Sequence, residues 1–286
     1  MNTDMRGDGD LVVTTPDSRD LGVRVWGEPA GAPVFWLHGT PGSRMLRDPT
    51  DTYARHGLAV CTYDRPGYGL SSRRPGRTHA QTVDDVVAIA DALGWDRFAV
   101  AGASGGSGPA LAVAALLPER ATRCAVIVGV APSTAAEINA TMPDDDRAQW
   151  ERAARGDERA LAKDFDEVLQ WFDAGMPDVN IDNEANRHML EELVHEGRRQ
   201  GALGYVDDLI ADARDWGFSV EDVRVPTKIL AAEEDSQFMH LSSRWLADHI
   251  PAAELLWRAG GHIDPKGDEE ARLFAWLGHG HCPAVH

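Results

Sequence analysis

The chain has 286 residues, 43% of them hydrophobic and 26% charged, which excludes a disordered or collagen-like protein and supplies apolar side chains for one large core. Its 28 Lys and Arg against 46 Asp and Glu give a formal net charge of −18, which argues against nucleic acid or an anionic membrane surface as the main partner. The three cysteines, Cys61, Cys124 and Cys282, lack the spacing of a zinc site or a disulfide framework. We expect a globular protein that acts on a small molecule and uses no metal or other cofactor.

The beginning of the chain lacks the apolar region of a signal peptide, and no apolar run reaches the ~20 residues of a membrane helix. These features predict a cytoplasmic protein that does not associate with a membrane.

In chain order, the first predicted element is a hairpin formed by residues 11–15 and 21–26 around the turn-forming PDSRD segment. Short apolar runs then alternate with segments of helical period. The expected strands are PVFWLHG, LAVCTYD, DRFAVAGAS, CAVIVGVAP, TKILAAEED and AELLWRAGGH, and the expected helices cover residues 82–93, 108–117, 241–250 and 268–277. This alternation predicts an α/β protein with a mostly parallel sheet covered by helices on both faces.

Residues 133–222 lack the apolar runs of strands and have an acidic, helical pattern. A structureless loop of this length is uncommon inside a compact domain, so we expect an inserted helical lid. The predicted division is a core of residues 1–132 and 223–286 and a lid of residues 133–222. Aromatic residues at helical spacing favour packing roles for Trp150 and Trp171, and the role of Trp216 stays open.

The segment Gly102-Ala103-Ser104-Gly105-Gly106 follows an apolar strand and precedes a helix. A G-x-S-x-G sequence in this setting is typical of a nucleophile elbow, the sharp turn that lifts a serine hydroxyl above a sheet. Ser104 is therefore the candidate nucleophile, although a simple glycine-rich turn would have the same sequence. Ser107 lies beyond the sharp turn and is expected only to cap the following helix or to lie in its first turn.

A serine nucleophile needs a base, and the base needs an acid that orients it. His262 follows a glycine pair after the strand AELLWRAGGH and is the candidate base. Glu233, Glu234 and Asp235 end the preceding strand, and Asp235 is preferred because it is the one leaving the strand for the loop, with Glu234 as the alternative.

An acyl-transfer intermediate also needs backbone N–H donors for its oxyanion. Gly105, directly after the candidate nucleophile, would supply one donor. The loop His38-Gly39-Thr40-Pro41-Gly42 would supply the other through Thr40, because Pro41 has no N–H.

These motifs, in this order, resemble the α/β-hydrolase superfamily, with HGTPGS similar to the oxyanion loop, YDRPGYGLS to the segment after the following strand, and GASGGSG to the elbow. The HG-x-PG loop and helical lid are most similar to proline iminopeptidase-like hydrolases and small-molecule esterases. The resemblance implies a serine hydrolase of ester or amide bonds that works through an acyl-enzyme, carboxylesterase-like or aminopeptidase. Two alternatives remain: a small-molecule binder or receptor on the same fold, and a biosynthetic thioesterase or cyclase that uses the same triad.

Overall fold

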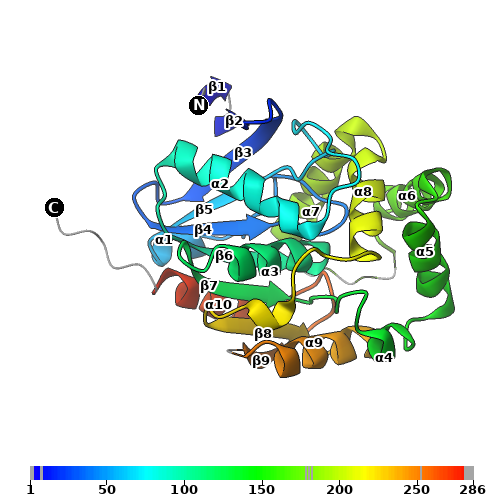
Figure 1. Cartoon of the computed structure of the whole chain (residues 1–286). Helices are drawn as coiled ribbons and strands as arrows, with labels where there is room; N and C mark the ends of the chain where they lie inside the picture. The colour runs from blue at the N-terminus through cyan, green and yellow to red at the C-terminus, as the bar shows by residue number, and fades with distance from the viewer. Residues whose placement is uncertain are drawn as a thin grey trace.

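The computed structural model describes residues 3–6 and 9–279, apart from residues 178, 180, 182 and 252. Within this part of the chain nine strands form one sheet in the order β1-β2-β3-β5-β4-β6-β7-β8-β9 (Figure 1). The strands are β1 (Thr3–Arg6), β2 (Asp10–Thr14), β3 (Asp20–Gly27), β4 (Ala32–Leu37), β5 (Leu58–Tyr63), β6 (Phe98–Ala103), β7 (Ala121–Ile127), β8 (Thr227–Ala232) and β9 (Ala253–Arg258).

The sheet is antiparallel at its N-terminal edge and parallel from β5 to β9. The hairpin of β2 and β3 is the one that the turn sequence predicts. Strand β1 and the short helix α1 (Thr52–Arg55) were not predicted, because a four-residue element offers too few positions to show a period.

Side chains alternate across the central strand β4, where Phe35 and Leu37 enter one core and Val34 and Trp36 the other. Helices α2 (Thr82–Leu93) and α3 (Ser107–Leu116) contribute to the first core, and α9 (Gln237–His249) packs on β8 and β9. Helices α1 and α10 (Glu269–Gly278) contribute to the second core. The mostly parallel sheet with helices on both faces is therefore confirmed.

Between β7 and β8 the chain forms a run of helices, here called the helical insertion. It comprises α4 (Ala136–Asn139), α5 (Asp144–Arg155), α6 (Glu158–Asp173), α7 (Glu184–Gly197) and α8 (Leu203–Asp212), with the 3₁₀ turn η4 (Arg198–Gln200) between the last two. In Figure 1 the insertion lies beyond the end of the sheet towards which the central strands point. It therefore faces the edge at which α/β sheets place their ligands.

Candidate active site

Ser104 lies at the turn between β6 and α3, in the 3₁₀ turn η3 (Ser104–Gly106). Its φ of 51° is in the left-handed region, which a non-glycine residue rarely adopts. The turn is tight on both sides, because a Cβ on Gly102 would collide with the backbone of Gly106, and one on Gly106 would lie 2.6 Å from the His38 carbonyl oxygen. The two glycines thus permit the turn that exposes the serine. Ser107 begins α3, and its hydroxyl donates to the Ser104 carbonyl oxygen at 2.6 Å.

The structure brings Ser104, His262 and Asp235 together from three separate loops. The Ser104 hydroxyl lies 3.0 Å from Nε2 of His262, and Nδ1 of the same ring lies 2.7 Å from Oδ2 of Asp235. Burial favours a raised pKa for Asp235, but the hydrogen bond and the charge of His262 outweigh it, so the pKa is lowered. The carboxylate therefore stays ionised beside the imidazole.

Asp235 stands in a turn and not at the end of a strand, because β8 already ends at Ala232. The strand predicted as TKILAAEED is thus three residues too long. The side chains of Glu233 and Glu234 are exposed, whereas that of Asp235 is 8% exposed. Its Oδ1 also accepts a hydrogen bond from the Ser236 N–H at 2.8 Å, which helps to orient the carboxylate.

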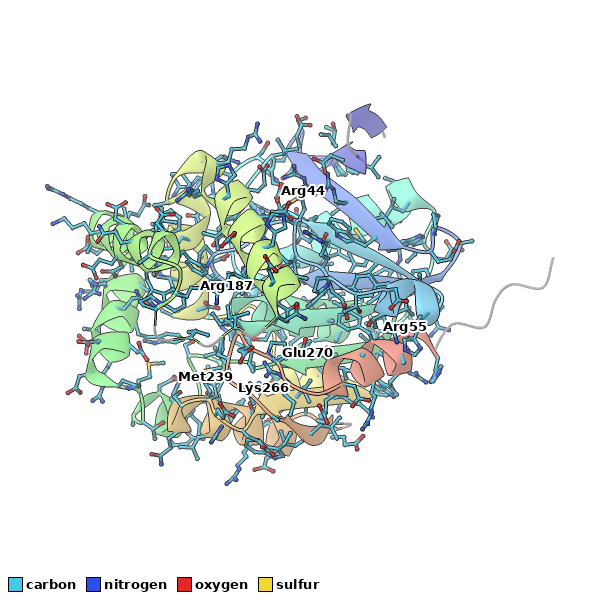
Figure 2. The ribbon with its side chains drawn as sticks, turned by 180° about the vertical axis from the view of Figure 1, so that it is seen from behind. Arg44, Arg55, Arg187, Met239, Lys266 and Glu270 are labelled. Atoms are coloured by element: carbon cyan, nitrogen blue, oxygen red, sulfur yellow. The ribbon has the colours of Figure 1, made fainter. Side chains whose placement is uncertain are left out.

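The backbone of the loop that carries His262 is hydrogen-bonded to Arg258. This arginine is the last residue of β9 and is almost fully buried. Its guanidinium donates to the carbonyl oxygens of Gly261 at 2.9 Å and of His262 at 3.1 Å. Its Nε lies 3.1 Å from Oε1 of Glu270, which lies in the first turn of α10 (Figure 2). An ion pair between β9 and α10 therefore supports the backbone that presents the imidazole.

The loop after β4 lies directly over the elbow. A Cβ built on Gly39 would stand 3.3 Å from Cβ of Ser104, and one built on Gly105 would stand 3.4 Å from the backbone nitrogen of Thr40. The two residues predicted to supply oxyanion donors, Thr40 and Gly105, therefore lie next to each other and beside Ser104.

Thr40, Ser104 and Gly105 line a cavity of about 210 Å³. The rest of its wall comes mainly from the helical insertion, including Gln149 and Trp150 of α5 and Tyr205, Leu209 and Asp212 of α8. Trp150 packs against two hydrophobic clusters and also faces this cavity, so the packing role predicted for it is incomplete. Trp216 is buried in the core and contacts His79 edge to face.

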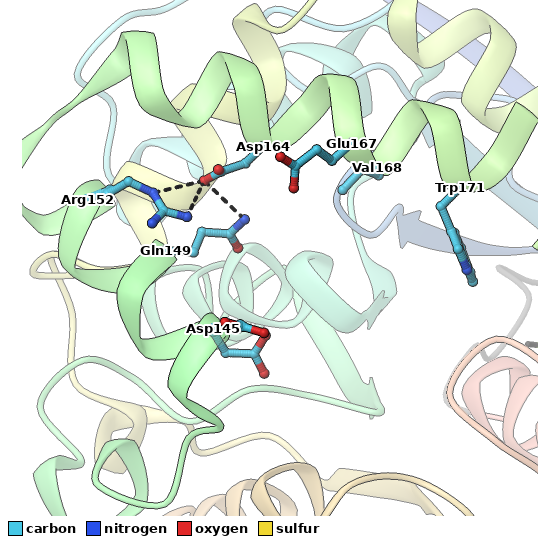
Figure 3. A pocket seen from close by; sticks show the side chains of 8 residues that line it. Asp145, Gln149, Arg152, Asp164, Glu167, Val168 and Trp171 are labelled. Atoms are coloured by element: carbon cyan, nitrogen blue, oxygen red, sulfur yellow. Dashed lines mark hydrogen bonds and ion pairs between the residues drawn. The ribbon is translucent and has the colours of Figure 1, made fainter.

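A second, more open groove of about 290 Å³ lies between α5 and α6 (Figure 3). It shares Asp146, Gln149 and Val168 with the cavity at Ser104. Asp164 accepts hydrogen bonds from Arg152 and Gln149 in this groove, and Asp145 and Glu167 add further carboxylates. The groove beside the cavity thus carries four carboxylates and one guanidinium group. Trp171 also lines the groove, and its ring meets that of Phe172 edge to face.

A buried polar network behind the oxyanion loop was not predicted from the sequence. Its centre is Asp208 of α8, fully buried, which accepts hydrogen bonds from Arg65 at 2.7 Å, Tyr68 at 2.7 Å, Thr40 at 2.8 Å, and Arg77. Burial favours a raised pKa for Asp208, but the two guanidinium groups outweigh it and hold the pKa well below its usual range. The sequence does not single out Asp208, because the adjacent Asp207 is also among the buried residues of α8.

His38 is also buried in this region, at the end of β4. Its Nδ1 lies 2.7 Å from the Gly39 carbonyl oxygen, and its Nε2 accepts a hydrogen bond from the Arg65 N–H at 3.1 Å. Burial, with the nearby charge of Arg65, lowers its pKa to about 3. A neutral ring with the proton on Nδ1 satisfies both contacts.

Cys61 and Cys124 are buried free thiols, and burial raises the pKa of Cys61, which argues against its use as a nucleophile. Cys282 and His281 lie outside the described residues. Among the residues that the structure describes, no group of three or more His, Cys, Asp or Glu side chains is arranged to hold a metal ion. None of the described helices is both long enough and apolar enough to cross a membrane.

A family model described as alpha/beta hydrolase fold matches residues 32–265. The chain belongs to the alpha/beta hydrolase fold family. Over 234 residues it is 26% identical to the bifunctional esterase/perhydrolase DCH of Acinetobacter calcoaceticus, a match that covers 78% of this chain and 81% of that protein. Over 120 residues it is 35% identical to a proline iminopeptidase of Xylella fastidiosa, covering 39% of this chain and 36% of that one.

Among solved structures, the enol-lactonase from Burkholderia xenovorans has a TM-score of 0.65 and 22% sequence identity, covering 93% of this chain and 96% of that one. At this identity the likeness concerns the fold. Together the matches confirm the resemblance to the α/β-hydrolase superfamily and place the chain among hydrolases of the esterase and peptidase type.

Proposed function

We propose that the protein is a serine hydrolase that cleaves carboxylic esters of small molecules through an acyl-enzyme. The observation that carries this proposal is the continuous hydrogen-bonded chain from Asp235 through His262 to Ser104, with 2.7 Å and 3.0 Å between the donor and acceptor atoms. A serine is made nucleophilic by such a base, oriented in turn by a carboxylate.

In the acylation step, the Ser104 oxygen attacks the ester carbonyl carbon while Nε2 of His262 takes the serine proton. The negative charge that develops on the carbonyl oxygen is stabilised by the N–H groups of Gly105 and Thr40. The tetrahedral intermediate then expels the alcohol, which receives the proton from His262. Asp235 remains ionised throughout and stabilises the imidazolium.

In the deacylation step, a water molecule attacks the carbonyl carbon of the acyl group bound to Ser104, and His262 takes a proton from this water. Collapse of the second tetrahedral intermediate releases the carboxylic acid and returns the proton to Ser104. Water thus supplies one hydroxyl and one proton, and the enzyme is regenerated unchanged.

We propose that residues 133–222 form the lid and that residues 1–132 and 223–286 form the core. The lid supplies most of the cavity wall and therefore limits the size of the substrate. A cavity of about 210 Å³ is smaller than the roughly 300–1,000 Å³ of typical ligand pockets, so a short acyl group fits it best. An ester substrate is favoured over a peptide because the esterase relative matches most of this chain, whereas the iminopeptidase matches little more than a third of it.

The test combines labelling with turnover. A fluorophosphonate probe should add one covalent mass, located on a peptide that contains Ser104, and p-nitrophenyl acetate should be hydrolysed in a reaction that Ser104→Ala abolishes. Hydrolysis should slow along the series acetate, butyrate, octanoate. Labelling at Ser107 or Cys61, or full activity of Ser104→Ala, would overturn the assignment. Saturable ester binding without release of p-nitrophenol would indicate a binder or receptor instead.

A further inference from the structure

We infer that Asp208, a residue of the helical insertion, positions the oxyanion loop by holding the side chain of Thr40. The inference deepens the proposed function and rests on it, because it assigns Thr40 a backbone N–H that stabilises the reacting oxygen. Helix α8 would then have two roles, since it lines the cavity and also positions a residue that stabilises the oxyanion.

The contacts of Thr40 support this role. Its hydroxyl donates to Oδ2 of Asp208 at 2.8 Å and accepts from Nη2 of Arg65 at 3.1 Å. The same Arg65 nitrogen donates to the carbonyl oxygen of Gly39 at 3.0 Å. Side chain and backbone are thus held on both sides of the Gly39–Thr40 peptide group, whose nitrogen lies 3.4 Å from the position of a Cβ built on Gly105.

The surroundings make this arrangement rigid. Arg65, Arg77 and Asp208 have side chains that are 1%, 4% and 0% exposed, and all three form ion pairs within the cluster. Tyr68 adds a hydrogen bond to Oδ2 of Asp208 at 2.7 Å. A buried carboxylate with this many donors has a single favourable position, which is a property required of a group that must hold a catalytic donor in place.

The cluster combines charged and neutral buried groups. Two guanidinium groups face one carboxylate, while Tyr68 and His38 are neutral near pH 7 because burial moves the pKa of each away from that range. Arg73 and Asp207, the next charged pair, balance each other at 2.8 Å. Buried Asp64 and Asp85, and Asp212 in the cavity wall, add carboxylates around the cluster, so its role is to hold the loop in position rather than to supply a net positive charge.

The contact itself is tested with Thr40→Val, which removes the hydroxyl and keeps the backbone N–H, and with Thr40→Ser, which keeps both. We expect kcat for p-nitrophenyl acetate, counted per fluorophosphonate-labelled site, to fall by about tenfold or more in Thr40→Val, since loss of a whole oxyanion donor costs about 10²–10³. KM should change little, and Thr40→Ser should restore kcat. Inhibition by phenylboronic acid, which forms a tetrahedral adduct, should weaken in parallel with kcat.

Asp208→Asn should lower kcat per labelled site as well, and its effect should not multiply with that of Thr40→Val, because the effect of both changes on the oxyanion loop acts through the hydrogen bond between Thr40 and Asp208. The neighbouring Asp207→Asn is the matched control: it also breaks a buried ion pair of α8, so it should lower the unfolding temperature but leave kcat per labelled site unchanged. If Asp208→Asn does not fold, the Thr40 pair still decides the question.

Wild-type kcat per labelled site in Thr40→Val, or multiplying effects in the double variant, would overturn the inference. Ser104→Ala is assayed in parallel, so that a failure of the proposed function can be distinguished from a failure of the role inferred for Asp208. Activity that survives in Ser104→Ala would refute the proposed function, whereas activity that requires Ser104 but ignores Thr40→Val would refute only the role of Asp208.

Discussion

Asp235 is the acid on which the proposed triad depends, and two other carboxylates precede it directly in the chain. Only Asp235 contacts His262, while Glu233 and Glu234 point to solvent from the same turn. The choice among the three is made by the direction of the turn after β8. A carboxylate one residue earlier would need a different backbone path to reach the ring.

Asp235→Asn should therefore keep the fold and lower kcat by about 10³–10⁴, because an amide no longer stabilises the imidazolium or its tautomer. Glu233→Gln and Glu234→Gln should each stay within about twofold of the wild type, as expected of exposed residues away from reacting atoms. The comparison uses kcat per labelled site for p-nitrophenyl acetate. An inactive Glu234→Gln beside a fully active Asp235→Asn would move the role to Glu234.

His38 gives the protein a specific sensitivity to acid. Its pKa is about 3 in the folded protein against 6.5 ordinarily, so below pH 6.5 the unfolded chain binds a proton that the folded one excludes. The unfolded state then binds more protons, and the free energy of unfolding falls as the pH falls from 6.5 towards 3. Between pH 6.5 and 4.5 this one group should cost about 2 kcal/mol.

Urea unfolding of the wild type and of His38→Gln at pH 6.5 and 4.5 measures this contribution. The variant should be less stable at pH 6.5, because it alters the contacts to Gly39 and Arg65, but it should lose about 2 kcal/mol less on acidification. Equal acid losses in both proteins would show that His38 does not exclude a proton in the folded state.

At the scale of elements, the junction of β6 and α3 requires that backbone atoms approach closely. A Cβ on Gly106 would lie 2.6 Å from the carbonyl oxygen of His38 and 2.9 Å from the carbonyl carbon of Leu37, both of them backbone atoms at the end of β4. Neither can move aside without disturbing the pairing of β4 with β6. The small residue therefore sets how near the elbow lies to the oxyanion loop.

Gly106→Ala should destabilise the fold by about 3 kcal/mol or more, the upper range for overpacking, since the clash is with backbone. Gly261→Ala is the control, because a Cβ added at Gly261 would have no other atom within 4 Å and the residue has no positive φ. The unfolding temperature of this variant should stay near that of the wild type. Thermal unfolding by circular dichroism provides the measurement. A Gly106→Ala protein as stable as Gly261→Ala would mean that the junction is looser than described.

At the scale of the whole molecule, the chain has a net charge of −18. Part of the negative charge lies in the groove between α5 and α6, which adjoins the cavity at Ser104. A cleft lined by one sign of charge raises the local concentration of oppositely charged substrates. Esters that carry a positive charge should therefore reach the cavity faster than neutral ones of the same shape.

Acetylthiocholine should be hydrolysed with a kcat/KM about tenfold above that of its neutral isostere 3,3-dimethylbutyl thioacetate at low salt, the low end of such steering effects. The advantage should vanish as ionic strength rises from about 0.01 M to about 1 M, which shortens the Debye length from about 30 Å to about 3 Å. The double variant Asp145→Asn, Asp146→Asn should reduce the advantage at low salt. A ratio independent of salt and of these aspartates would exclude steering by the groove.

The sequence by itself determined the layered α/β fold, the position of the elbow and the order of its motifs, because these depend on short-range patterns: apolar runs, helical periods and glycines at fixed spacing. The helix predicted for residues 82–93 has those bounds in the structure. Only the tertiary structure decided which of three adjacent acids meets His262 and which helix of the insertion reaches the oxyanion loop. Asp208 and Arg65 are 143 residues apart, and a pair that distant leaves no periodic trace in one sequence. The contact exists because the insertion folds back over the carboxyl ends of the strands. There Asp208 forms ion pairs with buried arginines, which offsets the cost of burying these charges.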